Sequence, residues 1–126
     1  MLFVARGRFN EGINLADHIA RACFVVGIPY LPLGDSKVIL RKNYAESKSD
    51  HSKAYLRDSK DSAGDLWYKT DAMREVSQIM GRCVRHKDDY AAIFLVDARY
   101  LAKPHKCNLP SWFTHRLKPF FNAEHL

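Results

Sequence analysis

Short apolar runs separated by polar segments set the pattern of this chain. Three runs, over residues 1–5, 22–28 and 90–96, are rich in Val, Ile and Phe and do not alternate with polar residues. Runs of this kind are typical of parallel strands that are covered on both faces. The pattern therefore predicts an α/β fold, with a mostly parallel sheet of about three strands flanked by helices.

A long amphipathic helix is expected between the second and third runs. Thr70 or Asp71 is the expected N-cap, and the helix should run to about Arg85. Residues 43–64 carry many Ser, Lys and Asp residues, and we interpret them as a variable polar insertion, with some helix over 36–44. The apolar residues that recur at helical spacing, and that should form the buried stripe, are Met73, Val76, Ile79, Met80, Cys83 and Val84.

The whole chain, residues 1–126, is expected to form one domain. The first predicted strand begins at residue 1, and about three strands make a small sheet for this architecture. We therefore expect an N-terminally incomplete lobe, either a truncated product or a fragment. The segment 109–113 should pack back on the body. No apolar run approaches the roughly 20 residues that cross a bilayer, so a soluble, intracellular protein without a membrane partner is expected.

Charge favours a polyanionic partner. The net charge is +6 and the pI is about 9.3, and each phosphate that a basic side chain neutralises releases counterions. This signal is weak by itself, because the basic residues are spread along the chain. The three cysteines and six histidines show no metal-ligand spacing, so no metal site is expected and the thiols should be reduced.

One string on the predicted helix carries candidate chemistry. Gln78, Arg82 and Arg85 stand at i, i+4 and i+7 in the pattern Q-x-x-G-R-x-x-R. Gly81 costs a helix about 1 kcal/mol relative to alanine, so it calls for a reason such as the close approach of a backbone or a phosphate. Two arginines in this arrangement can clamp a transferring phosphoryl group. The simpler interpretation is a solvated polar face.

A second candidate segment leaves the first predicted strand. It contains Arg6, Arg8 and Glu11, and Gly7 and Gly12 allow its backbone to approach a ligand closely. A loop of glycines and charges is ordinary, so this segment alone predicts little. Four aromatic residues elsewhere could stack on bases, although packing in the core or at a hinge is favoured for each of them: Tyr30, Trp67, Tyr68 and Trp112.

Taken together, these strings resemble a known family. VARGRFNEGINLADHIARACFVVGIPY resembles motif V of the XPD/FANCJ/RTEL-like superfamily-two iron-sulfur DNA helicases. AMREVSQIMGRCVRHKDDYAAIFLVDARY resembles their motif VI with the strand that follows, and LPSWF resembles the end of the lobe. The resemblance covers nearly the whole chain except the polar insertion, and motif VI followed by R-H-x-x-D-Y-A is its most specific part.

The resemblance implies a RecA-like second motor lobe that closes an ATP and Mg²⁺ site against a first lobe. ATP hydrolysis would drive movement along single-stranded or forked DNA, 5′ to 3′, in the nucleus. On this basis Gln78 would contact the nucleotide beside Gly81, and Arg82 and Arg85 would reach the γ-phosphate.

The motif V resemblance implies a second set of roles. Glu11 and Gly12 would link the nucleotide site to the DNA track. Arg6 and Arg8 would lie near the strand-binding surface. Asn14 stands where many members have Asp, which puts its nucleotide-site role in doubt.

Several helicase parts are absent from the sequence. It contains no G-x-x-x-x-G-K-[ST] string and no D-E-A-H-type acidic pair. The resemblance assigns both to the first lobe, together with the iron-sulfur cluster. We therefore expect the isolated chain not to hydrolyse ATP. The alternative function is a non-catalytic module, derived from a helicase lobe, that binds nucleic acid or protein.

Overall fold

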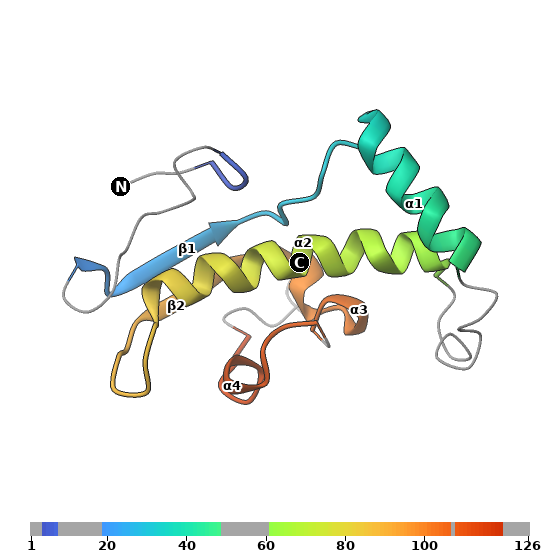
Figure 1. Cartoon of the computed structure of the whole chain (residues 1–126). Helices are drawn as coiled ribbons and strands as arrows, with labels where there is room; N and C mark the ends of the chain where they lie inside the picture. Colours follow the sequence, from blue (N-terminus) through green and yellow to red (C-terminus); the bar gives the residue numbers. More distant parts are fainter. Residues whose placement is uncertain (1–3, 8–18, 49–60, 107, 120–126) are drawn as a thin grey trace.

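The computed structural model describes residues 4–7, 19–48, 61–106 and 108–119 (Figure 1). None of the helices in these ranges is long and apolar enough to span a bilayer. The elements in chain order are β1 (Ala22–Val26), α1 (Ser36–Lys48), α2 (Ala63–Cys83), β2 (Ala92–Val96), the 3₁₀ helix η4 (Ala98–Leu101), α3 (Lys103–Lys106) and α4 (Ser111–Thr114).

The sheet of the described residues has two parallel strands. β1 pairs with β2 in a register that runs from Ala22 opposite Ala92 to Val26 opposite Val96. The predicted parallel α/β fold is thereby confirmed. Of the first apolar run, residues 1–3 lie outside the described residues, and Val4 is followed by a turn in which the amide of Gly7 donates to its carbonyl at 3.0 Å. A third strand is therefore not seen in the part of the chain that the structure describes.

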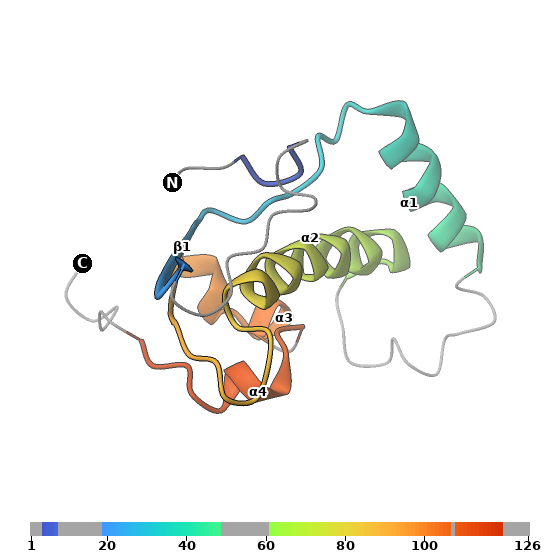
Figure 2. The same cartoon turned by 60° about the vertical axis from the view of Figure 1, so that its left-hand side comes forward.

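The expectation that the strands are covered on both faces is wrong for these two strands. Side chains alternate between the two faces of a strand, and α2 lies against one face of the sheet (Figures 1 and 2). On the other face Phe24 is 64% exposed and Val26 is 79% exposed, and the rings of Phe24 and Phe94 stack with centroids 4.5 Å apart. The two apolar runs thus have the composition of strands that are buried on both faces, although the described residues cover only one face of the sheet.

The core forms between α2 and the inner face of the sheet. Met73, Val76 and Met80 are each 0% exposed and follow the i, i+3, i+7 spacing of one helical stripe. Leu109 and Phe113 are also buried, so the segment 109–113 packs back on the body as predicted. The other buried residues of this cluster are Val25, Ile28, Ala72 and Tyr100.

α2 begins seven or eight residues before the expected N-cap, which was Thr70 or Asp71. Ser62 caps the helix, its side chain accepting a hydrogen bond from the amide of Asp65 at 3.1 Å. Packing against α1 explains this earlier start, because Lys42 Nζ lies 2.7 Å from Asp65 Oδ1 and a Cβ on Gly64 would lie 2.9 Å from the carbonyl oxygen of Lys42. The described ends of the expected insertion, residues 43–48 and 61–64, therefore belong to or adjoin helices.

We expect Ser62→Ala to lower the free energy of unfolding by about 1 kcal/mol, because an orphan amide of the first turn of α2 loses its acceptor. Urea denaturation followed by circular dichroism measures the change. Thr70→Ala is the matched control, because Thr70 lies inside α2 and caps nothing. A larger loss from the Thr70 variant than from the Ser62 variant would contradict the observed start of the helix.

Candidate functional site

Gln78 and Arg82 lie on one face of α2, opposite the buried stripe. They are one helical turn apart in the last two turns of the helix, where Gln78 is exposed and Arg82 is half-buried. Between them, Gly81 has no heavy atom of another part of the chain within 4 Å of the position that a Cβ would take. Intrachain crowding therefore does not explain this glycine in the described residues. Among the described residues the position beside Gly81 is therefore open, next to the exposed amide of Gln78 and to Arg82, whose Nε is shielded from solvent.

Arg85 is placed differently from Gln78 and Arg82. α2 ends at Cys83, and Val84 is its extended C-cap (φ −129°, ψ 102°), whose amide donates to the carbonyl of Met80 at 3.1 Å. The helix was expected to run to about Arg85, but it ends two residues earlier. Helical spacing therefore does not set the direction of the Arg85 side chain. Its amide instead donates to Asp89 Oδ2 at 3.2 Å.

Asp89 joins the end of α2 to both strands. Its side chain is 0% exposed, and its carboxylate accepts hydrogen bonds from Arg21 Nη1 at 2.8 Å and from the amide of Tyr90 at 2.9 Å. Arg21, which directly precedes β1, also lies over the Tyr90 ring at 4.1 Å from its centroid. Sequence reasoning missed this connection. The available signal was the R-H-x-x-D-Y string, which placed Asp89 directly before a strand.

Arg6 is held by contacts within the chain. Its Nε donates to the carbonyl of Pro29 at 2.8 Å, and its Nη2 lies 2.8 Å from Asp71 Oδ2. Its φ of 64° lies in the left-handed region, which helps the turn bring the side chain over α2. The nucleic-acid role of Arg6 stays a prediction. The other predicted motif V residues lie outside the described residues: Arg8, Glu11, Gly12 and Asn14.

Comparison with known protein families shows which family this chain belongs to. The model of the helicase C-terminal domain matches residues 1–116. The chain belongs to the helicase C-terminal domain family. Its relatives include the regulator of telomere elongation helicase 1 homologs of Culex quinquefasciatus and Aedes aegypti, each 40% identical over 114 residues, which is 90% of this chain. The resemblance to a C-terminal lobe of XPD/RTEL-like helicases is thereby confirmed.

This helicase domain is a small part of those relatives. The chain spans 11% of the length of the Culex and Aedes proteins. The corresponding protein of Anopheles gambiae is 36% identical over 115 residues, again with 11% of its length covered. The family match therefore identifies the chain as a C-terminal helicase lobe, and the activity of a whole protein remains a proposal.

In this helicase lobe, polar residues meet where β1 and β2 end. The hydroxyl of Tyr30 lies 2.6 Å from Nε2 of His105, which is 7% exposed, and burial lowers the pKa of His105 and raises that of Tyr30. The Tyr30 ring stacks on Tyr68 with centroids 5.0 Å apart. Asp97 accepts from Arg99 Nη2 at 2.6 Å, and this partner lowers the pKa of the Asp97 carboxyl. These contacts tie the loops of the lobe to each other.

The two cysteines of the lobe that are described lie near each other. Cys83 is buried. The pKa of the Cys23 thiol is raised to about 12, mainly because Cys23 itself is partly buried and secondly because Cys83 lies beside it. Cys23 is therefore a protonated thiol at neutral pH. Among the described residues, no group of three His, Cys, Asp or Glu side chains is placed to hold a metal ion.

Proposed function

We propose that this chain is the motif V and motif VI part of the second motor lobe of an ATP-dependent DNA helicase. The observation that carries the proposal is the placement of Gln78 and Arg82 on the face of α2 opposite the core, beside the open space at Gly81. The family match over residues 1–116 supports it. A first lobe would be the obligatory partner, because the sequence has no phosphate-binding loop of its own.

The side chains at the end of α2 fit a shared nucleotide site. ATP with Mg²⁺, held mainly by the first lobe, would supply the phosphoryl group whose transfer to water drives movement. Gln78 has an exposed amide that can orient the nucleotide. Arg82 and Arg85 are proposed to stabilise the negative charge on the γ-phosphate, as arginine fingers do. Asp89 is proposed to act as a positioning residue, because it holds the backbone of Arg85.

The remaining roles follow the motif V assignment. We propose that Glu11, Gly12 and Asn14 connect the nucleotide site to the DNA track, and that Arg6 and Arg8 lie beside the strand. The substrate would be single-stranded or forked DNA, with 5′ to 3′ movement. A nuclear location is proposed because the relatives are named for telomere elongation. An iron-sulfur cluster would belong to the first lobe.

The proposal is tested on a protein that joins this chain to a first lobe. We expect the isolated chain to hydrolyse no ATP above background, because the residues that cradle the phosphates are in the other lobe. The two-lobe protein should hydrolyse ATP faster when single-stranded DNA is added. It should also displace a strand from duplexes with a 5′ single-stranded tail. A rate of ATP hydrolysis that does not change when DNA is added would contradict the proposal. Strand displacement from 3′-tailed duplexes alone would also contradict it.

A further inference from the structure

Four exposed side chains form a stripe along α1. Lys37, Arg41, Tyr44 and Lys48 stand at i, i+4, i+7 and i+11, which on a helix of 3.6 residues per turn places them within a sector of about 60°. All four are exposed, and Tyr44 is 65% exposed. Over eleven residues the stripe is ~16 Å long at 1.5 Å per residue. We call these four residues the basic stripe.

The basic stripe lies away from the side of α1 that contacts the body. That inner side holds Val38, which is 2% exposed, and Lys42, which is paired with Asp65. Glu46 is the one acidic residue of α1, and its Oε1 accepts from the amide of Gly64 at 3.1 Å, on the α2 side. α1 stands out from the rest of the molecule and meets it at the start of α2 (Figure 1). The stripe thus presents three positive charges and no carboxylate to solvent.

A merely solvated helix face is the alternative, and two features argue against it. Solvated faces commonly mix charges of both signs, whereas Lys37 and Arg41 form a like-charge pair at i, i+4, which destabilises a helix. An exposed aromatic ring also lies between the charges, with Lys48 Nζ 5.7 Å from the centroid of Tyr44. Cations interleaved with an exposed ring match the chemistry of a charged backbone that carries flat bases.

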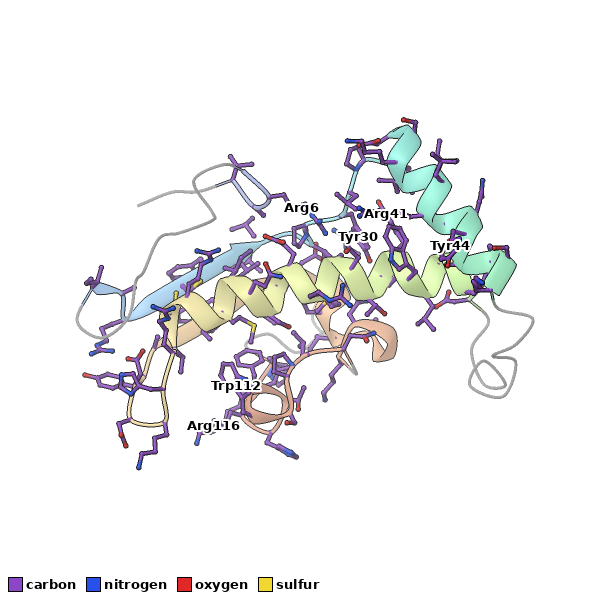
Figure 3. All side chains as sticks on the ribbon, viewed as in Figure 1. Arg6, Tyr30, Arg41, Tyr44, Trp112 and Arg116 are labelled. Atoms are coloured by element: carbon purple, nitrogen blue, oxygen red, sulfur yellow. The ribbon has the colours of Figure 1, made fainter. Side chains whose placement is uncertain are left out.

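We propose that the basic stripe binds single-stranded nucleic acid. Lys37, Arg41 and Lys48 would contact successive phosphates, and Tyr44 would stack on a base. Figure 3 shows Arg41 and Tyr44 at α1, apart from Trp112 and Arg116, which are labelled around α4. The identity of the occupant rests on the proposed helicase function. The contact itself lies outside motifs V and VI, so it adds a second place at which the lobe holds the strand.

The test measures the salt dependence of binding. The chain is titrated into fluorescently labelled oligothymidylate at several salt concentrations, and anisotropy gives the affinity. Two phosphate contacts fewer should make the slope of log K against log salt shallower by about 1.4 in Arg41→Gln/Lys48→Gln, at about 0.7 per phosphate of a single strand. Affinity at low salt should fall about tenfold. Tyr44→Leu should lower affinity about fivefold with the slope unchanged, because it removes stacking and no charge.

The matched control removes two positive charges from another part of the chain. Lys106→Gln/Lys118→Gln changes exposed lysines outside α1 and should leave the slope nearly unaltered. Equal losses in both double variants would show a net-charge effect and overturn the proposal. Competition by polyglutamate as strong as by oligothymidylate would indicate an acidic protein partner and would also overturn it. Absence of wild-type binding at low salt overturns it too, whereas ATP hydrolysis by the two-lobe protein tests the helicase function separately.

Discussion

Alanine at Arg82 or at Arg85 should lower ATP turnover by the two-lobe protein a hundredfold or more. Both guanidinium groups are proposed to act on the charge that develops on the γ-phosphate, and arginine fingers contribute on the order of 10³ to 10⁵ in kcat. Lysine should not restore turnover, because a point charge does not reproduce the planar fork of arginine. Steady-state ATP hydrolysis, with kcat and KM measured separately, provides the readout. The loss should appear in kcat, because the interaction is strongest in the transition state.

The fold should survive both substitutions. Arg85 is exposed and lies beyond the helix, so its alanine variant should unfold within about 0.5 kcal/mol of wild type. Arg82 is half-buried, so a somewhat larger loss is expected from its packed stem. Arg116→Ala, at an exposed arginine near α4, is the control and should keep full turnover. Unchanged turnover in both the Arg82 and Arg85 variants would rule out their assignment.

The main elements were predictable because local composition determines them. The runs over 22–28 and 90–96 contain β1 and β2, and the stripe from Met73 to Cys83 contains the buried face of α2. The start of α2 was harder to predict, because Ser62 belongs to the stretch 43–64, whose Ser, Lys and Asp content suggests a loop. The hydrogen bond from the amide of Asp65 to Ser62, and the packing of α1 on this turn, stabilise the helix there. Such tertiary support is not visible in periodicity.

The candidate site was predictable where a single helix determines it. Gln78 and Arg82 share a face because both lie inside α2. The position of Arg85 depends on where the helix ends, and the contacts of Arg6 with Pro29 and Asp71 depend on how distant segments pack. Spacing along the chain carries no information on either point. The same limit applies to the partnership of Asp89 with Arg21, which are separated by 68 residues.

That partnership gives the prediction with the largest expected effect on stability. We expect Asp89→Ala to lower the free energy of unfolding by about 3 kcal/mol. The Asp89 carboxylate is fully shielded from solvent, and its removal leaves Arg21 and the amides of Arg85 and Tyr90 without their acceptor. Arg21 is 37% exposed, so water should offset part of the loss. Urea denaturation monitored by circular dichroism measures the change, since a domain of this size is expected to unfold in one cooperative step.

Two variants separate the charge of Asp89 from its shape. Asp89→Asn keeps an oxygen that can accept from the amide of Tyr90, so it should cost less than Asp89→Ala. Asp88→Ala changes the exposed neighbouring aspartate and should stay within about 0.5 kcal/mol of wild type. Because Asp89 also holds the backbone of Arg85, its alanine variant should lower kcat in the two-lobe protein under conditions where the protein remains folded. Equal stability of the Asp88 and Asp89 alanine variants would show that the buried carboxylate does not hold the end of motif VI against β1.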